Sequence, residues 1–398
     1  MNEADNIRVL FLTIGVFDKG GISRYGRYQT RAFIEVVGRE NLKVLSLRGP
    51  GRNDFEPLPL VDYHASDVNL ISYIRIAIAL VRYVFSFKPE VVWCGHLHLL
   101  PLCLMIRLMR PKVCVIVSVY GEELWSGRKW FHHRMLPRAN LVVADCHFSR
   151  EFVISDYRLS PEQVLVIWDC VDLEVFRPAE RCQLLLGKFD IPTGPSLRYV
   201  LTLGRIERRT QYKGYDRLLD ALARLNDPEA VVLFAGDGND RERLQRRALQ
   251  MGLEAQAIFL GSISDIELTG VYNLCDLFIL ASDRGEGRGE GIPLAVLEAL
   301  ACGKPVIVGD EDGSRESVLA GRNGRVVSPR DPDALVGAMR EILNDESLRL
   351  EMGVSARRIG EEQFGYERFR NQTAVALQRA LGSRADFMKE ADVQVSAR

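Results

Sequence analysis

Two glutamates with seven residues between them, Glu290 and Glu298, are the strongest candidates for chemistry in this 398-residue chain. Glu290 lies in a glycine-rich loop after the apolar run 277–281. Glu298 lies about five residues into a predicted helix over 293–302, roughly 7–8 Å along its axis. Carboxylates accept hydrogen bonds strongly from hydroxyl groups, so the pair could hold two separated points of one extended ligand, such as a nucleotide-sugar. The alternative is a solvated loop glutamate and an ordinary surface glutamate on a capped helix.

The start of that helix offers a place for an anion. Pro293 suits a first helical turn, and Gly303 suits the position just after the last turn. Backbone N–H groups and the helix dipole favour negative charge at such an N-terminus. If the helix opens into a ligand-binding cleft, a diphosphate is the anion that we expect there.

Two cations form a second candidate site. Arg205 follows a predicted strand over 199–203, and Lys213 comes a short loop later. An arginine fork and a lysine point charge could together clamp a diphosphate leaving group. The alternative is a solvated basic loop, since Arg208 and Arg209 lie between them.

Two glycine-containing turns are weaker candidates. Gly20 and Gly21 follow the first predicted strand and precede a helix, where paired glycines let the backbone approach a phosphate. Gly236, in the run 235–238 after another strand, could pass beside a ribose or a base. A plain tight turn and a structural loop are the alternatives. The chain has neither a complete G-x-G-x-x-G fingerprint nor a Walker A sequence.

The elements that must position these residues follow an α/β pattern, in which short apolar runs alternate with amphipathic stretches. Twelve strands are predicted, at 8–14, 43–47, 91–94, 113–119, 141–144, 164–167, 199–203, 230–234, 257–260, 277–281, 305–308 and 324–327. Repeated strand–helix spacing predicts parallel sheets with helices on both faces. We expect two Rossmann-like, doubly wound domains of about six strands each, facing a central cleft lined by the carboxyl ends of their strands.

The boundary between the domains is predicted in the segment 177–198, which is rich in proline and glycine. We assign residues 1–185 to the N-terminal domain and residues 186–366 to the C-terminal domain. Residues 367–398 form a helix, over 367–381, and a tail. We expect this helix to pack back on the N-terminal domain.

The composition excludes several classes of protein. The formal net charge is −1, whereas a nucleic-acid-binding protein carries a basic excess. The acidic N-terminus does not resemble a signal peptide, and no window of about 18 uncharged apolar residues predicts a membrane-spanning helix. The eight cysteines form no C-x-x-C pair, as expected of reduced thiols in a cytoplasmic protein. The basic aromatic stretch 128–138 predicts either peripheral contact with the inner face of a membrane or a solvated helix face.

No metal and no cofactor is expected. The six histidines show no metal-ligand spacing such as H-E-x-x-H. The D-x-D pattern at 310–312 and 331–333 is a metal–nucleotide motif of a different transferase fold, and so short a match arises easily by chance.

Taken in order, these motifs make the chain similar to the GT4-type retaining glycosyltransferases of the GT-B fold, over about residues 7–367. The hallmark of that family is an E-x7-E motif, which Glu290 and Glu298 match within the run 290–307. Further matches are Gly204-Arg205, Lys213-Gly214, the run 235–238 and Asp312–Glu316, a variant of the family's Gly-Gly-x-x-Glu stretch.

The resemblance implies a role for each candidate. Glu290 would lie beside the donor sugar, and Glu298 would hold the ribose. Arg205 and Lys213 would bind the diphosphate. The C-terminal domain would therefore bind the nucleotide-sugar, and the N-terminal domain would bind the acceptor.

Main-chain contacts follow from the same resemblance. The loop that contains Gly20 and Gly21 would close over the phosphates and the acceptor. Backbone N–H groups would also contact phosphate and sugar in the segment Gly291, Ile292, Pro293 and Leu294, in which the proline has none to donate.

One departure from the family concerns the acceptor and sugar side. Many members carry a His-Gly pair after the strand that matches 113–119, where this chain has Tyr120-Gly121. Tyr120 could hydrogen-bond the sugar in place of that histidine. His96 follows the strand 91–94 and either faces the acceptor or is a satisfied structural histidine.

The resemblance predicts a metal-independent, retaining enzyme that moves a hexose from a UDP-hexose or GDP-mannose to a hydroxyl group of a saccharide or lipid-linked acceptor. Such an acceptor fits polysaccharide, glycolipid or cell-envelope synthesis. The alternatives are a sugar-nucleotide epimerase or hydrolase of the same fold, and a non-catalytic nucleotide-sugar-binding subunit.

Overall fold

The computed structural model describes residues 7–18, 20–50, 61–125, 130–284, 287–319 and 321–396, without the side chains of Glu122 and residues 383–396. The acidic N-terminus and the pair Arg128–Lys129, for which the sequence made predictions, lie outside these residues.

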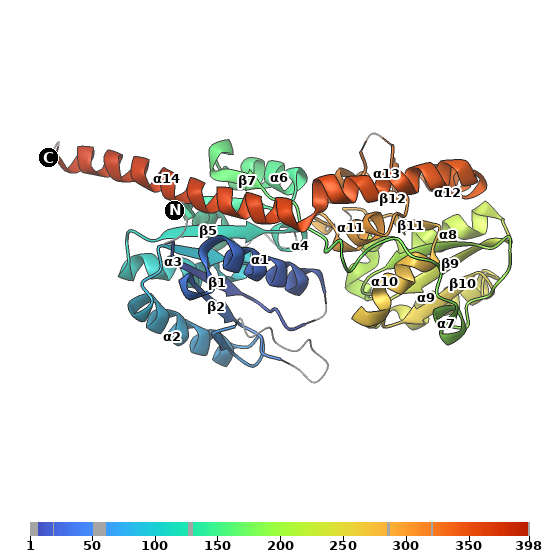
Figure 1. Cartoon of the computed structure of the whole chain (residues 1–398), viewed down its shortest axis with the longest axis horizontal. Helices are drawn as coiled ribbons and strands as arrows, with labels where there is room; N and C mark the ends of the chain where they lie inside the picture. The colour runs from blue at the N-terminus through green and yellow to red at the C-terminus, as the bar shows by residue number, and fades with distance from the viewer. Residues whose placement is uncertain are drawn as a thin grey trace. The chain divides into compact units, whose positions relative to one another are not determined.

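Two compact units make up the chain (Figure 1). Unit 1 comprises Met1–Asp169 and Tyr366–Arg398, and unit 2 comprises Cys170–Gly365. The segment 177–198, where the first domain boundary was predicted, lies within unit 2. The second division of the chain falls one residue before the predicted 366/367 boundary.

Unit 1 is built on a seven-stranded parallel sheet with the strand order β3-β2-β1-β4-β5-β6-β7. Its strands are β1 (Val9–Thr13), β2 (Leu42–Ser46), β3 (Tyr63–His64), β4 (Val91–Cys94), β5 (Cys114–Val119), β6 (Leu141–Ala144) and β7 (Val164–Val166). All six strands predicted for this half are present. The edge strand β3 was missed because two residues carry no apolar pattern.

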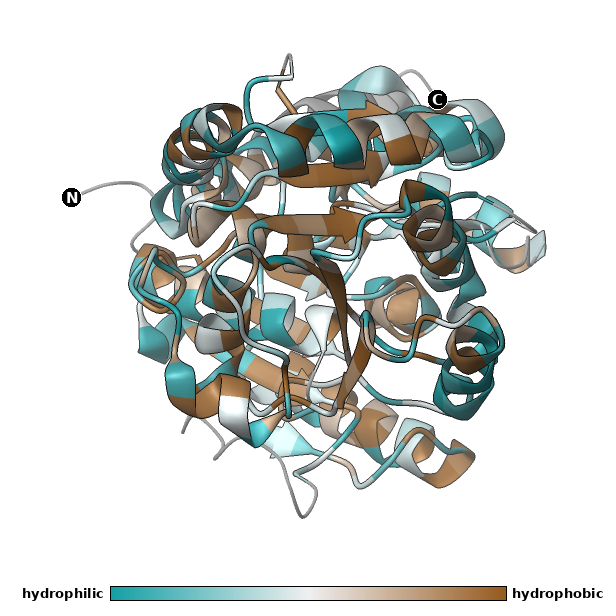
Figure 2. Cartoon of the chain, turned by 90° about the vertical axis from the view of Figure 1, so that its right-hand side faces the viewer, coloured by the Kyte–Doolittle hydropathy of each residue, from teal (hydrophilic) through white to brown (hydrophobic). Residues whose placement is uncertain are grey.

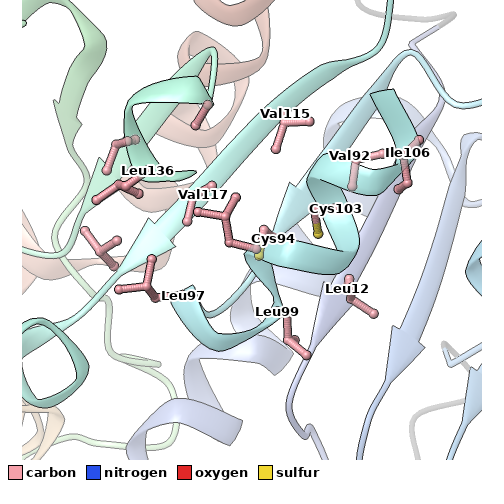
Figure 3. Close-up of a cluster of buried hydrophobic side chains, with 14 of the residues drawn as sticks. Leu12, Val92, Cys94, Leu97, Leu99, Cys103, Ile106, Val115, Val117 and Leu136 are labelled. Atoms are coloured by element: carbon pink, nitrogen blue, oxygen red, sulfur yellow. The ribbon is translucent and has the colours of Figure 1, made fainter. Parts of the chain in front are cut away.

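Helices cover both faces of this sheet. They are α1 (Gly21–Val37), α2 (Leu70–Ser86), α3 (Leu100–Met109), α4 (Gly121–Trp125), α5 (Trp130–Met135), α6 (His147–Tyr157) and α14 (Tyr366–Ser396). On one face α2 and α3 press apolar side chains against the strands. Cys103 and Ile106 of α3 join Leu12, Val92 and Val117 in one buried cluster (Figure 3).

The opposite face is covered by α1 and the C-terminal helix α14, which contact each other. Nε2 of Gln29 donates a hydrogen bond to Oγ1 of Thr373 at 3.2 Å, and the rings of Tyr25 and Phe369 meet edge to face at 5.4 Å. The helix that follows unit 2 is therefore part of unit 1. It continues to Ser396, past the predicted end at residue 381.

Unit 2 is built on a six-stranded parallel sheet with the order β10-β9-β8-β11-β12-β13. Its strands are β8 (Arg198–Leu203), β9 (Ala230–Ala235), β10 (Ala257–Gly261), β11 (Leu277–Leu280), β12 (Val306–Gly309) and β13 (Gly324–Val327), and all six were predicted. Its helices are α7 (Gln183–Lys188), α8 (Tyr215–Leu225), α9 (Arg241–Gln250), α10 (Asp265–Leu274), α11 (Leu294–Ala301), α12 (Pro332–Asn344) and α13 (Glu346–Phe364).

The hydropathy pattern explains why these runs become strands and helices. In Figure 2 the strands are mainly brown, whereas the helices around them mix brown and teal. Strands of a parallel sheet are buried on both faces and are apolar throughout, and the covering helices are amphipathic.

Each sheet has one point at which the strand order reverses, between β1 and β4 in unit 1 and between β8 and β11 in unit 2. Doubly wound sheets bind ligands at the carboxyl ends of the strands beside this point. Arg205 and Lys213 follow β8, and Glu290 follows β11. The fold therefore places these three predicted donor residues at the reversal point of unit 2.

The chain enters unit 2 once and leaves it once, and these two connections lie side by side. The N–H of Val171 donates to the carbonyl of Phe364 at 2.9 Å, and Val171 forms an isolated parallel bridge with Gly365. Unit 2 is thus one continuous segment whose two ends meet.

Candidate active site

The loops after β8 and β9 are fastened to each other, and this fixes the main chain at Arg205. The N–H of Gly204 donates to the carbonyl of Ala235 at 3.0 Å, and the N–H of Ile206 donates to that of Asp237 at 3.0 Å. Gly236 has a φ of +129°, and a Cβ atom there would lie 1.9 Å from the carbonyl oxygen of Gly204. Position 236 therefore requires a glycine because its backbone is in contact with the backbone of Gly204. This explanation corresponds to the structural loop that the sequence left open as an alternative to a ribose or base contact.

Arg205 lies at the exposed tip of this pair of loops. Its carbonyl accepts hydrogen bonds from the hydroxyls of Thr210, at 2.8 Å, and Tyr215, at 3.2 Å. The main chain of Arg205 is thus held by two largely buried hydroxyl groups. The exposed guanidinium therefore extends from a fixed main chain and can bind an anion.

Lys213 and Glu290 are brought together. Nζ of Lys213 forms a hydrogen-bonded ion pair with Oε1 of Glu290, and both side chains are mostly shielded from solvent. Lys213 precedes α8 and Glu290 follows β11, so the two residues meet although 77 positions separate them. A cation and a carboxylate at one point provide one group for a phosphate and one for a sugar hydroxyl.

A second pair of charged residues braces the two loops. The guanidinium of Arg217 donates to the carbonyls of Tyr212 and Ala281 at 2.8 Å and pairs with Asp283 at 2.8 Å. The N–H of Asp283 donates to the carbonyl of Tyr212 at 2.8 Å. The loop of Lys213 is therefore tied to the end of β11, where the segment that leads to Glu290 begins.

Asp312 holds the main chain of Glu290, a role that the sequence did not reveal. Its Oδ2 accepts from the N–H of Glu290 at 2.9 Å, and its Oδ1 accepts from the N–H and hydroxyl of Ser314 at 3.0 and 2.5 Å. Burial, countered by the Ser314 and Glu290 donors, raises the pKa of Asp312 to about 6. The D-x-D pattern at 310–312 thus contains a residue that positions Glu290.

We expect an Asp312→Ala variant to lower kcat about 100-fold while changing the dissociation constant of the donor less than about threefold. If Glu290 acts on the sugar and Lys213 on the diphosphate, a displacement of Glu290 by about 1 Å would lower the rate by this factor, whereas Lys213 would keep its position. Steady-state kinetics and donor titration measure the two effects. Asp312→Asn keeps one acceptor oxygen and should recover part of kcat.

The pH dependence of kcat distinguishes a loss of Glu290 positioning by Asp312 from a general loss of folding. Above about pH 6 both oxygens of Asp312 accept hydrogen bonds, and protonation below that pH turns one of them into a donor. The kcat of the parent should therefore fall as the pH drops through about 6, and Asp312→Asn should lack this limb. Asp310→Ala, at an exposed neighbour, is the control and should keep kcat and the limb. An unchanged kcat in Asp312→Ala would show that Glu290 needs no such support.

Helix α11 begins at Leu294, and Pro293 caps it from outside the first turn. Gly303 lies just after the helix with a φ of +69°, which confirms its predicted position. Gly291 is partly exposed, whereas Ile292, Pro293 and Leu294 are buried. Side chains thus anchor this segment, and its backbone is the part that could meet a ligand.

Glu298 lies inside α11 and is buried. Its Oε2 accepts a hydrogen bond from the hydroxyl of Tyr272, on α10, at 2.7 Å. The alternative of an exposed surface glutamate is therefore wrong. The hydrogen bond from Tyr272 fixes the position of this carboxylate inside the helix.

In unit 1 the Gly20–Gly21 turn opens α1. Gly20 caps the helix with a φ of +129°, and nothing lies within 4 Å of the place that a Cβ would occupy. Both glycines are exposed. The turn therefore leaves open space at the N-terminus of a helix that follows β1, beside the reversal point of its sheet.

Tyr120 directly follows β5 and is buried. Its N–H donates to Oε1 of Glu123 at 2.6 Å, and its hydroxyl donates to the carbonyl of Gly95 at 3.2 Å. Burial, with the nearby Tyr25, Asp169 and Glu123, raises the pKa of Tyr120 well above its usual value. The hydroxyl therefore stays protonated, and its oxygen could accept a hydrogen bond from a sugar.

His96 lies close to Tyr120, with ring centroids 6.2 Å apart. Its Nδ1 accepts from the N–H of His98 at 3.3 Å, so Nε2 carries the proton of the neutral ring. Burial and the charges of His98 and His132 lower the pKa of His96 to about 3. At neutral pH His96 is an uncharged ring beside Tyr120, at the carboxyl ends of β4 and β5.

Two further findings concern metal ions and membranes. Within the described residues, no group of three or more His, Cys, Asp or Glu side chains is arranged to hold a metal ion. None of the described helices combines the length and apolar character that crossing a membrane requires. In the stretch 128–138, Trp130 and Arg134 are exposed, whereas His132 is buried.

Family models match both halves of the chain. Residues 189–359 match the model described as glycosyl transferases group 1, and residues 19–175 match the model described as glycosyltransferase family 4. The first range contains the Lys213–Glu290 pair and Glu298, and the second contains Gly20, Gly21, His96 and Tyr120.

One relative is similar over most of the chain. It is a GDP-mannose-dependent alpha-(1-6)-phosphatidylinositol monomannoside mannosyltransferase of Mycolicibacterium smegmatis, 36% identical over 85% of this chain and 90% of its own length.

Solved structures share the fold at low sequence identity. Anabaena Alr3699/HepE in complex with UDP aligns with a TM-score of 0.76 at 18% identity, over 94% of this chain and 100% of the other. Sucrose-phosphate synthase of Thermosynechococcus elongatus aligns with a TM-score of 0.77 at 18% identity, over the same shares. Both family models, the relative and the two doubly wound sheets agree: the chain belongs to glycosyltransferase family 4, whose members have the GT-B fold.

Proposed function

We propose that this glycosyltransferase moves a hexose from a nucleoside diphosphate sugar to a hydroxyl group of a saccharide or lipid-linked acceptor, with retention of the anomeric configuration. The observation that carries the proposal is the Lys213–Glu290 ion pair, held at the carboxyl ends of β8 and β11. It unites a cation for the diphosphate and a carboxylate for the sugar at the reversal point of the sheet.

The donor diphosphate would compete with Glu290 for Lys213. A diphosphate carries more negative charge than one carboxylate, so Lys213 would turn from Glu290 to the phosphate oxygens. Arg205 would approach the same phosphates from the neighbouring loop, and the N-terminus of α11 would add its backbone N–H groups. Glu290 would then be released to accept hydrogen bonds from the transferred sugar.

The reaction would need no metal and no cofactor. Arg205 and Lys213 would neutralise the departing diphosphate. The acceptor hydroxyl would attack the anomeric carbon on the face from which the diphosphate leaves, and a phosphate oxygen would take its proton. One bond forms and one breaks on the same face, so the configuration is retained. Tyr120 and His96 would lie on the acceptor and sugar side.

GDP-mannose is the donor that we propose first, and a UDP-hexose is the alternative. The relative that is 36% identical uses GDP-mannose and acts on a phosphatidylinositol mannoside. A glycolipid acceptor of the cell envelope would suit a cytoplasmic enzyme that contacts the inner face of the membrane.

A panel of nucleotide-sugars tests the proposal. We expect GDP-mannose to raise the melting temperature and to be hydrolysed slowly without acceptor, equally well with and without a chelator. NMR of the product bond should show the anomeric configuration of the donor. If no nucleotide-sugar binds, the proposal is wrong, and if a chelator abolishes transfer, the metal-free mechanism is wrong.

A Glu298→Ala variant should weaken donor binding about 10- to 100-fold, because a charged acceptor for the ribose hydroxyls is removed. Calorimetric titration with GDP-mannose measures the loss. Tyr272→Phe is the matched control, since it removes the hydrogen bond to Glu298 and keeps the carboxylate. If Tyr272→Phe weakens binding as much, the role of Glu298 is to support the fold and not to hold the ribose.

A further inference from the structure

Three carboxyl groups and a phenol lie together at the carboxyl ends of β5, β6 and β7 in unit 1. Tyr120 directly follows β5 and Asp145 directly follows β6, and these two strands are paired up to their last residues. Asp169, three residues after β7, is close enough to both for their charges to interact. Oε1 of Glu123, on α4, accepts the N–H of Tyr120 at 2.6 Å. We name Tyr120, Glu123, Asp145 and Asp169 the acidic cluster.

Asp169 has a carboxyl oxygen without a partner. The residue is only 7% exposed, and its Oδ1 is buried without a hydrogen bond in the part of the chain that the structure describes. None of the described basic residues pairs with it. Burial, together with the charge of Asp145, raises the pKa of Asp169 well above its usual value. A buried carboxyl group beside a second one lowers the stability of the fold, which makes a role in ligand binding a reason for its presence.

The acidic cluster offers hydrogen-bond acceptors and negative charge. The hydroxyl of Tyr120 donates to the carbonyl of Gly95 at 3.2 Å, which leaves the phenol oxygen as an acceptor. The carboxyl oxygens of Asp145 and Asp169 only accept when they are ionised. The nearby His96 is uncharged at neutral pH, because its pKa is lowered to about 3, first by burial. It therefore brings no positive charge to the cluster.

We propose that the acidic cluster binds a primary ammonium group of the acceptor, so that the acceptor is an amino sugar. An ammonium group has three donors and no acceptor, which matches the oxygens of Tyr120, Asp145 and Asp169. A hydroxyl group would place no positive charge between the two aspartates, whereas an ammonium group would form charge-assisted hydrogen bonds with both. A metal ion fits less well, since no three His, Cys, Asp or Glu side chains of the described residues are arranged to hold one.

Binding would change the protonation of Asp169 and would break no covalent bond. Without a ligand, Asp169 keeps its proton to a higher pH than an exposed aspartate does. The ammonium cation would lower that pKa, and the proton would pass to solvent. The four residues of the acidic cluster remain between 4% and 8% exposed, so the cluster borders on solvent. A turn of the Asp169 side chain would present Oδ1 to the ligand.

This inference rests on the proposed function for the claim that the ligand is the sugar acceptor. The two can fail separately, because binding of an amino sugar is measured without a donor. Transfer that is as fast to an acceptor without an amino group as to its amino analogue would keep the proposed function and contradict the ammonium site. Failure of every nucleotide-sugar to bind would contradict the proposed function alone.

Calorimetric titration of the full chain with the methyl glycosides of glucosamine, N-acetylglucosamine and glucose tests the ammonium site. At about pH 6 the amine is charged, and we expect its glycoside to bind about tenfold or more tightly than the other two. Titration in buffers with different heats of ionisation should show proton release with the amine only. Asp169→Asn should abolish both the preference and the proton release, because an amide replaces one carboxylate oxygen by a donor.

Two controls separate binding from folding. Asp169→Asn should unfold at the same temperature as the parent or a higher one, since it removes the repulsion with Asp145. Asp62→Asn removes a carboxylate of unit 1 that already pairs with Lys43, and it should keep the preference for the amine. The proposal is overturned by a parent that binds the three glycosides alike or does not bind the amine. Equal weakening of all three glycosides in Asp169→Asn, or loss of the preference in Asp62→Asn, would also overturn it.

Discussion

Replacing Lys213 by alanine is expected to lower kcat/KM for the donor by about three orders of magnitude. The substitution removes the cation that would neutralise the leaving diphosphate, and one such group contributes roughly 10²–10³ in rate. It also leaves Glu290 beside the phosphates as an uncompensated negative charge, which weakens donor binding further. Steady-state kinetics with GDP-mannose and a direct binding measurement separate the two effects.

Two variants make this result specific. Glu290→Gln leaves Lys213 without its ion-pair partner, so donor binding should be kept or tightened while kcat falls about 100-fold. Lys188→Ala removes another lysine of unit 2 that pairs with a glutamate, Glu267, at an exposed site, and it should change neither quantity more than about twofold. If Lys213→Ala and Glu290→Gln lose donor binding alike, the pair only supports the fold and our assignment of roles fails.

Replacing Gly236 by alanine is expected to destabilise unit 2 by about 3–5 kcal/mol, because a Cβ at 1.9 Å from the carbonyl oxygen of Gly204 forces two loops apart. The φ of +129° adds strain that an L-residue rarely tolerates. For a unit of this size the loss corresponds to a decrease in melting temperature of about 10 °C, measurable by calorimetry. Donor binding should weaken as well, since the same loops hold Arg205.

Gly252→Ala is the control for backbone strain without a clash. Gly252 also has a positive φ, +70°, but no atom lies within 4 Å of its Cβ position. Alanine there should cost only about 1–2 kcal/mol. If the two alanine variants are equally stable, the contact with Gly204 does not explain why position 236 needs a glycine.

The strands and helices of this fold could be predicted from the sequence because each depends on a local pattern of residues. Strands such as β4 and β12 are buried on both faces and therefore appear as short, purely apolar runs. The end of α11 could be predicted for a similar reason, since Gly303 adopts a positive φ after the last turn. Candidates such as Arg205 and Glu290 could be chosen because parallel sheets place ligands after their strands.

The contacts between those candidates could not be predicted. The pairing of Lys213 with Glu290 depends on two loops that meet only when β8 and β11 lie side by side. Asp312 gave no signal of its role, because its hydrogen bond to the backbone of Glu290 depends on the path of the segment after β12. The burial of Glu298 under Tyr272 likewise depends on how α10 packs against α11. Spacing along the chain contains no information on such contacts.

The meeting of Val171 with Phe364 and Gly365 has a consequence for how this enzyme can change. Residues 170–365 form one uninterrupted stretch of the chain that contains a whole sheet with its helices. The first and last residues of this stretch lie next to each other. Recombination between relatives can therefore exchange this half without cutting through either hydrophobic core. If the two halves recognise different substrates, new donor–acceptor combinations can arise by shuffling, faster than by point substitution in either half.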